Sequence, residues 1–287
     1  MVNKEDVCAQ DWLGFDWSPW LTLHPDHDEL EALSTDPGLY RVRHPEYGGL
    51  VYIGETGRSL RGRVLALRRG IYDDEMPYSD PHPGSPSFWA IIQRHGTGFE
   101  VSGATPQLAT DSQHRKGIED ALIALHRRET GTNLIGNFGR MPPGFSKSKR
   151  RSSGERGSRS DDDTLRSFRR GVDPLSWKNA EDAIAPDWMG LDWSDPRPLE
   201  DALNDIPDTG GVYRIWDDDW YPPLEYIGES TSLKRRLRKH RRNRDGNLLF
   251  SFATLPELDE KFQLSQVESE LLGAHWLAYE LSPRDQY

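Results

Sequence analysis

The sequence predicts an α+β protein made of two tandem small domains, each a short antiparallel β-sheet flanked by helices. Three observations predict this class: a set of motifs that occurs twice, the same order of β-rich and helical runs in each copy, and a basic segment between the copies. The 287 residues suffice for two compact domains, since a domain usually takes about 100–200 residues.

The repeat consists of three motifs at a nearly constant offset. DWLGFDW at residues 11–17 recurs as DWMGLDW at 187–193, GLY at 38–40 recurs as GVY at 211–213, and YIG at 52–54 recurs at 226–228. Chance similarity does not keep such a register, so the chain contains two copies of one unit. We expect the Trp residues of the first motif to be packed and to close the start of each domain.

A segment of different composition separates the copies. Residues 141–172 are rich in Lys, Arg, Ser and Gly and show no apolar periodicity, so they bury too little apolar surface to fold by themselves. We therefore predict a first domain over residues 1–140, a basic flexible linker over 141–172 and a second domain over 173–287.

The order of elements is the same in both copies. β-Branched and aromatic runs bounded by turn residues predict strands, and apolar residues three and four apart predict helices. In copy one we expect strands over 38–44 and 50–56, helices over 59–69 and 87–95, a strand over 99–104 and a helix over 112–129. In copy two we expect strands over 212–216 and 224–229, a helix over 232–242, a strand over 248–253 and a helix over 260–279.

Composition excludes several classes of protein. No stretch approaches the roughly 18 apolar residues of a membrane-spanning helix, the single Cys8 cannot form an internal disulfide, and the first residues lack the apolar core of a secretory signal. We expect a cytoplasmic protein without a membrane partner, whose two internal copies would let it act as a monomer. The excess of Arg over Lys is typical of a salt-adapted or a GC-rich source, and both interpretations stay open.

The helix after each YIG motif carries an Arg at the edge of its apolar face. In copy two, Arg236 and His240 lie at that edge, one turn apart. In copy one, Arg63 has the same place, but Leu67 stands where copy two has His240. The other basic residues around these helices face solvent or phosphate, and we take as nucleic-acid-binding candidates Arg58, Arg61, Arg68, Lys234, Arg235, Lys239 and Arg241.

The last long helix of each copy places a Glu inside an apolar stripe. Glu119 shares its face with His126, and Glu268 shares its face with His275. A Glu on a buried face costs free energy unless a cation or donors satisfy it, so its occurrence in both copies predicts a metal ion or an Arg partner. We expect both His residues to be packed. The neighbouring acidic residues are expected on the solvent side: Asp120 and Glu270.

Taken in order, these motifs resemble those of the GIY-YIG endonuclease family. The paired Tyr motifs are followed by an Arg helix and then by a Glu helix in both copies. The spacing from Tyr226 to Arg236 resembles the family pattern closely, whereas copy one has one extra residue before Ser59. The resemblance covers residues 38–138 and 211–287, and it leaves the Trp motifs and the linker unexplained.

The resemblance implies hydrolysis of phosphodiester bonds in nucleic acid. The Glu would hold one divalent cation, Mg²⁺ or Mn²⁺, a Tyr would activate or orient the attacking water, and the Arg would stabilise charge on the phosphate. The catalytic residues that it implies are Tyr40, Tyr52, Arg63, Glu119, Asn137, Tyr213, Tyr226, Arg236, His240 and Glu268, with Glu119 and Glu268 as the metal ligands.

The family also has an Asn after the Glu helix. Asn133 and Asn137 both qualify, and alignment of the two Glu helices pairs Asn137 with Gln286, which favours Asn137. Gln286 in copy two and Leu67 in copy one are departures from the family pattern. Either copy can therefore be the weaker site.

We expect a metal-dependent endonuclease that acts on DNA, with RNA left open as a substrate. Two sites in one chain would serve restriction or the cleavage of branched or damaged DNA. A second interpretation is a repair-type nuclease that makes one nick and uses its other copy for binding. The alternative outside enzymes is a nucleic-acid-binding module in which one or both sites are inactive.

Overall fold

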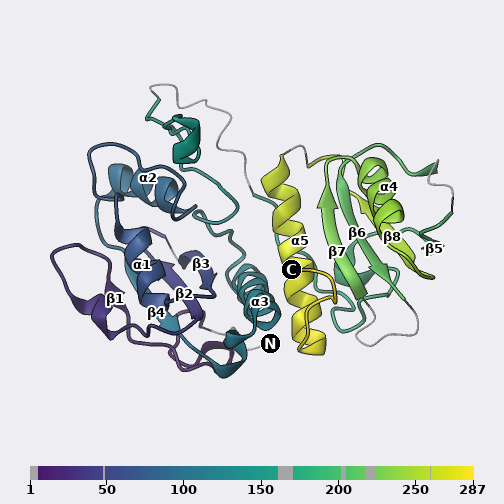
Figure 1. Cartoon of the computed structure of the whole chain (residues 1–287), viewed down its shortest axis with the longest axis horizontal. Helices are drawn as coiled ribbons and strands as arrows, with labels where there is room; N and C mark the ends of the chain where they lie inside the picture. Colours follow the sequence, from purple (N-terminus) through teal and green to yellow (C-terminus); the bar gives the residue numbers. More distant parts are fainter. Residues whose placement is uncertain (1–5, 48, 161–170, 202–204, 218–223, 259) are drawn as a thin grey trace. The chain divides into compact units, whose positions relative to one another are not determined.

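The computed structural model describes residues 6–47, 49–160, 171–201, 205–217, 224–258 and 260–287 (Figure 1). The chain forms two compact units. Unit 1 comprises residues 1–115 and 129–170, and unit 2 comprises residues 116–128 and 171–287. The division differs from the predicted domain limits, because the helix that ends copy one passes from unit 1 into unit 2.

Unit 1 holds a four-stranded antiparallel sheet with the strand order β1-β4-β2-β3. Its strands are β1 (Leu21–Thr22), β2 (Gly38–Arg43), β3 (Leu50–Thr56) and β4 (Glu100–Ala104). Its helices are α1 (Leu60–Arg68) and α2 (Ser85–His95), and α3 (Ser112–Thr130) begins in this unit. Tyr40 and Val42 of β2, Leu60 of α1 and Phe88 of α2 belong to one buried cluster, so both helices cover the same face of the sheet.

Unit 2 repeats this plan with the order β5-β8-β6-β7. Its strands are β5 (Arg197–Pro198), β6 (Gly211–Trp216), β7 (Leu224–Ser230) and β8 (Leu249–Thr254), and its helices are α4 (Leu233–Asn243) and α5 (Lys261–Tyr279). The sheet separates two buried clusters, one towards α4 and one towards α5 (Figure 1).

The described residues thus form two four-stranded antiparallel sheets and five α-helices, and the predicted α+β class is confirmed. Every predicted strand and helix is present, with ends that differ by one or two residues. The edge strands β1 and β5 were not predicted, because two residues are too few to show an alternating pattern. No helix in the described part of the chain combines the length and apolar character that crossing a membrane requires.

A buried Arg packs against the Trp motif in each unit, on the face of the sheet opposite the first Tyr. Arg41 on β2 is fully buried, with its guanidinium 4.3 Å from the centre of the Trp17 ring, and Arg214 on β6 lies 4.2 Å from that of Trp193. Burial lowers the pKa of Arg41 to about 10 and that of Arg214 to about 9, so both stay charged at neutral pH. Their backbone acceptors are Val7, Cys8 and Ala9 for Arg41, and Ala183 and Ala185 for Arg214. The Trp motifs are packed, as expected.

Part of the expected flexible linker is folded. Phe145 pairs with Arg159 in an antiparallel bridge, and Met141 and Phe145 are buried. Backbone hydrogen bonds close residues 144–160 into a turn structure that we call the basic hairpin: Ser146 with Ser158, Lys149 with Glu155, and Ser160 with Gly144. Two isolated apolar anchors leave no periodicity, so the sequence did not reveal this fold. Residues 161–170 of the predicted linker lie outside the described residues.

Within unit 2, residues 116–128 of α3 pack closely against α5. A Cβ on Gly273 would lie 2.4 Å from the backbone oxygen of Asp120, so only Gly permits this approach. The fully buried carboxylate of Glu270 lies 2.7 Å from Nε of the buried Arg127, and it also accepts hydrogen bonds from Leu175 and Trp177.

The predicted solvent positions of Asp120 and Glu270 are wrong. Glu270 is fully buried, and Asp120 is partly buried and accepts hydrogen bonds from the hydroxyls of Ser269 and Tyr287. The helical wheel assumed one buried face, turned towards the sheet. Because α5 packs on β7 and on α3, it has buried faces on two sides, and polar residues on the second face pair with each other.

We predict that Arg127→Met destabilises the protein by about 3–5 kcal/mol, because it leaves the Glu270 carboxylate buried without its cation. The double substitution Arg127→Met with Glu270→Gln should cost clearly less than the single one. Urea denaturation followed by Trp fluorescence measures both. A single substitution as mild as the double one would contradict this account of the pair.

Candidate functional site

Two Tyr rings from neighbouring strands stack in each unit. The ring centres of Tyr40 on β2 and Tyr52 on β3 are 5.7 Å apart, and those of Tyr213 and Tyr226 are 6.0 Å apart. Tyr40 lies opposite Gly54 in the β2–β3 ladder, where a Cβ would lie 2.6 Å from the Tyr40 ring. The Gly of the YIG motif therefore leaves the space that the first Tyr ring occupies.

An imidazole meets the hydroxyl of the first Tyr in both units. In unit 1, Nε2 of His82 lies 2.6 Å from the Tyr40 oxygen, and in unit 2, Nε2 of His240 lies 2.8 Å from the Tyr213 oxygen. Each imidazole also packs against the second Tyr, with ring centres 5.4 Å apart in unit 1 and 5.0 Å apart in unit 2.

The two imidazoles come from different places in the sequence. His240 lies on α4, whereas His82 lies in the segment between α1 and α2, and Leu67, the counterpart of His240, is buried in the core. We did not predict His82, because only the folding of residues 69–84 back over the sheet brings it to Tyr40. The sequence does contain one signal for it: copy one has the Tyr and Arg residues of the site but Leu67 where copy two has His240, so another residue could take the place of the His.

Hydrogen bonds fix which ring nitrogen carries the proton. Burial lowers the pKa of His82 to about 3, and burial together with neighbouring cations lowers that of His240 to about 4, so both rings are neutral at pH 7. Nδ1 of His82 accepts from the backbone of Gly84, and Nδ1 of His240 accepts from Arg244. The remaining nitrogen, Nε2, therefore carries the proton and donates to the Tyr hydroxyl.

Both Tyr hydroxyls of unit 2 stay protonated at neutral pH. Burial is the largest cause of the raised pKa of both Tyr213 and Tyr226. The negative charge of Glu268 also raises both pKa values, whereas the positive charge of Arg236 acts to lower them.

The Arg of each copy lies at this site. Nη1 of Arg63 donates to the backbone oxygen of Pro81, next to His82, over 2.8 Å. The positive charge of Arg236 acts to lower the pKa of Tyr213, of Tyr226 and of Glu268. The structure thus brings together the predicted Tyr213, Tyr226, Arg236, His240 and Glu268 in unit 2, and the predicted Tyr40, Tyr52 and Arg63 with His82 in unit 1.

Glu268 is a carboxyl group with a strongly raised pKa at the site. Burial, followed by the negative charges of Glu229 and Asp120, raises its pKa from 4.5 to about 8. The Glu229 backbone and Arg236 act in the opposite direction but do not compensate. Glu229 itself is buried, and burial raises its pKa as well. Two close carboxylates with too little positive charge around them favour a bound cation.

The donor set fits Mg²⁺ or Mn²⁺ at Glu268. In the part of the chain that the structure describes, no group of three or more His, Cys, Asp and Glu side chains is arranged to hold a metal ion. Mg²⁺ does not require such a group, because it keeps several waters and usually binds one or two carboxylates together with substrate phosphates. Glu268, with Glu229 beside it, supplies that number.

The corresponding carboxylate of unit 1 has a cation already. Glu55, the counterpart of Glu229, pairs with Arg115, which is almost fully buried. Arg115 also donates to the backbone oxygens of Ala109, Thr110 and Asp111. The predicted ligand Glu119 lies on the segment of α3 that belongs to unit 2. His126 and His275 are both buried, in agreement with the prediction that they are packed residues.

Asn137 and Gln286 occupy matching positions, as the alignment of the copies predicts. The Asn137 side chain accepts from the backbone of Ile53 and donates to its carbonyl, and Gln286 accepts from the backbone of Ile227. Each amide thus binds the edge strand between Tyr and Gly of the YIG motif. We interpret both as positioning residues. Asn133 instead lines a separate cavity, near Tyr47.

The predicted nucleic-acid-binding residues surround the site unevenly. Arg58, Arg235, Lys239 and Arg241 are exposed, and Lys234 is partly buried on α4. Arg61 and Arg68 instead donate to backbone oxygens of Leu33 and His27. In unit 1 a groove of about 640 Å³ is lined by Glu55, Arg58, Arg63 and Pro81 among others, so its wall is partly basic.

Comparison of the chain with protein-family models, with characterised proteins and with solved structures found no match.

We predict that Glu268 makes stability depend on pH. Its folded pKa of about 8 lies above the unfolded value of 4.5, so the stabilisation of the protonated form is complete below about pH 4.5 and is lost as the pH rises through 8. The melting temperature of Glu268→Gln should therefore fall less than that of the parent between pH 5 and about pH 8.5. Glu181→Gln, which removes an exposed carboxylate of unit 2, is the control and should follow the parent. Parallel curves for all three chains would contradict the assignment.

Proposed function

We propose that the chain is a metal-dependent endonuclease with two GIY-YIG-like sites that hydrolyse phosphodiester bonds in DNA. The observation that carries this proposal is the Tyr–Tyr–His–Arg arrangement that occurs in both units. In one unit the imidazole comes from a helix and in the other from a loop, yet each hydrogen-bonds the hydroxyl of the first Tyr of its own unit. A purely structural contact gives no reason for two routes to one geometry.

The residues of unit 2 divide the chemistry among themselves. Bound at Glu268, a Mg²⁺ ion would polarise the scissile phosphate. The Tyr226 hydroxyl, whose ring packs against those of Tyr213 and His240, would orient the attacking water through a hydrogen bond. Arg236 stabilises the negative charge that develops on the phosphate oxygens, since a preorganised cation is most effective where charge forms.

A specific observation favours a second candidate function for unit 1. Glu55 is neutralised by Arg115, whereas Glu229 has only the exposed Lys261, 3.8 Å away, as its ion-pair partner among the described residues. Unit 1 therefore attracts a cation less strongly near its Tyr residues. In this second candidate, unit 1 binds nucleic acid and unit 2 makes a single nick.

Conversion of supercoiled plasmid tests both candidates. We expect the parent chain to produce open-circular or linear DNA with Mg²⁺ or Mn²⁺ and none with EDTA. Glu268→Gln should abolish nicking if unit 2 acts alone. A reduced rate in each of Glu119→Gln and Glu268→Gln, with none left in the double variant, indicates two cutting sites. Glu181→Gln should cut like the parent. Failure of the folded parent to cut plasmid or branched DNA in either metal would leave the binding module as the function.

If both units cut DNA, removal of the imidazole should lower the nicking rate by a similar factor in either unit. In the Glu268→Gln background, His82→Ala should lower the remaining nicking rate about 10²-fold, the usual effect of removing one preorganised donor. In the Glu119→Gln background, His240→Ala should do the same. The exposed His27 provides the control substitution, His27→Ala, which should leave the rate unchanged. An undiminished rate in His82→Ala would contradict a role for this His.

A further inference from the structure

The basic hairpin concentrates positive charge in a protein that is otherwise acidic. Residues 144–160 contain six basic residues and one acidic residue, while the whole chain has a net charge of −11. All six basic residues are exposed: Lys147, Lys149, Arg150, Arg151, Arg156 and Arg159. Such a contrast is the electrostatic signature of a surface that binds polyanions.

Buried apolar contacts and backbone hydrogen bonds hold the hairpin in place. Phe145 is buried next to Trp89 of α2, and the backbone of Lys149 accepts from Ser79. Asp80 accepts from the backbone of Arg151. The hairpin is therefore attached to the segment that leads directly to His82.

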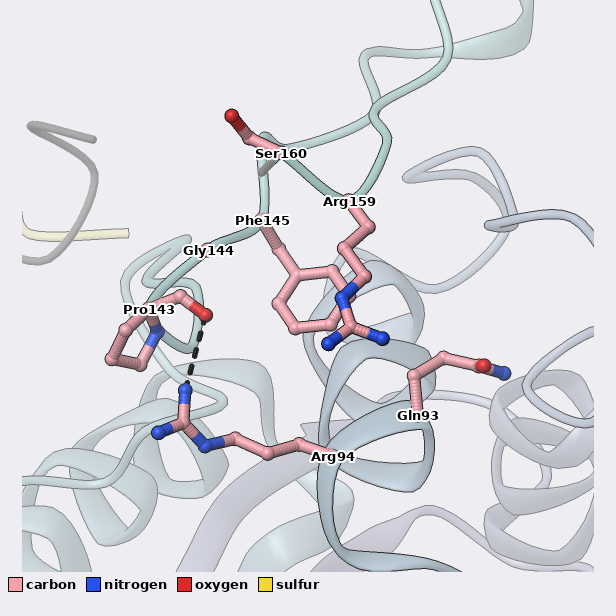
Figure 2. A pocket seen from close by; sticks show the side chains of 7 residues that line it. All are labelled: Gln93, Arg94, Pro143, Gly144, Phe145, Arg159 and Ser160. Atoms are coloured by element: carbon pink, nitrogen blue, oxygen red, sulfur yellow. Dashed lines mark hydrogen bonds between the residues drawn. The ribbon is translucent and has the colours of Figure 1, made fainter. Parts of the chain in front are cut away.

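A polar pocket of about 550 Å³ opens between the hairpin and the end of α2 (Figure 2). The guanidinium groups of Arg94 and Arg159 and the amide of Gln93 lie around it, with Phe145 and Ser160 completing the wall (Figure 2). Arg94 is oriented by a hydrogen bond of 3.3 Å to the backbone oxygen of Pro143.

The lining contains two Arg side chains and no carboxylate. Among the described residues, the ion pairs of the hairpin are Lys149 with Glu155 and Arg156 with Glu75, and neither includes Arg94 or Arg159. Two cations that share a pocket repel each other, and an anion bound between them relieves that repulsion. Guanidinium groups suit phosphate because they offer several donors in a planar fork.

We propose that this pocket binds one backbone phosphate of the nucleic acid, and that the basic hairpin carries the strand from there towards the His82 site. The identity of the ligand rests on the proposed function, whereas the pocket and its charge do not. Binding through the backbone carries no base sequence information, so the pocket would fix the position of the substrate and not its sequence.

Fluorescence anisotropy of a short labelled DNA duplex, in EDTA to prevent cutting and over a range of NaCl concentrations, tests the proposal. We expect Arg159→Gln to weaken binding about three- to tenfold and to reduce the slope of log affinity against log salt by about 0.9, the value for one lost phosphate contact. Arg159→Lys should keep the slope, because it keeps the charge. Lys178→Gln, which removes an exposed charge of unit 2, is the matched control and should resemble the parent.

Unchanged affinity and slope in Arg159→Gln would overturn the proposal. This is also the result expected if the hairpin binds an acidic protein surface and not DNA. A melting temperature that inorganic phosphate raises in the parent and not in Arg159→Gln, with duplex binding unchanged, would assign the pocket to free phosphate and also overturn it.

Plasmid nicking measured in parallel separates this proposal from the proposed function. A parent that nicks, with Arg159→Gln binding the duplex equally well, overturns the pocket alone. A parent that binds the duplex through Arg159 but nicks nothing in Mg²⁺ or Mn²⁺ supports the pocket and overturns the nuclease.

Discussion

The alternation of side chains along β2 and β6 is the constraint on which the rest of each unit depends. Neighbouring residues of a strand point to opposite faces, so Tyr40 turns towards His82 while Arg41 turns towards the Trp motif. Tyr213 and Arg214 repeat this division. A shift of one residue in register would exchange the two faces and bury the wrong group on each. The contact of the Arg with the Trp motif on one face therefore fixes the strand register, and with it the position of the Tyr hydroxyl on the other face.

The two units reach one local geometry by different routes. In unit 2 a longer helix, α4, carries His240 to the Tyr hydroxyl, and Arg244 just after it orients the ring. In unit 1 the helix α1 ends earlier, and a loop supplies His82, oriented by a backbone N–H. What is kept is the donor at the hydroxyl and the neutral form of the ring. The position of the donor nitrogen is thus the same in both units, although the residue that supplies it comes from a different place in the sequence.

Burial on two sides of α5 explains both the unusual acidity of Glu268 and the errors of the helical wheel. The segment 116–128 of α3 brings Asp120 close enough to add to the negative potential at Glu268, and it pairs Arg127 with Glu270. A carboxylate that is neutral in the free protein becomes a good cation ligand only when the cation displaces its proton. The packing of these helices thus affects the site as well as stability.

The α+β class, the repeat, nearly all strands and helices, the Tyr and Arg positions and Glu268 follow from the sequence, because these depend on local periodicity and on motifs a few residues long. It also predicted that Asn137 and Gln286 correspond. The packing of distant segments was needed to show that His82 contacts Tyr40, that Arg115 neutralises Glu55, that Asp120 and Glu270 are covered, and that residues 144–160 form a hairpin. Each of these depends on a contact between segments far apart in the chain, and the free energy of such a contact comes from burial and pairing that no local pattern encodes.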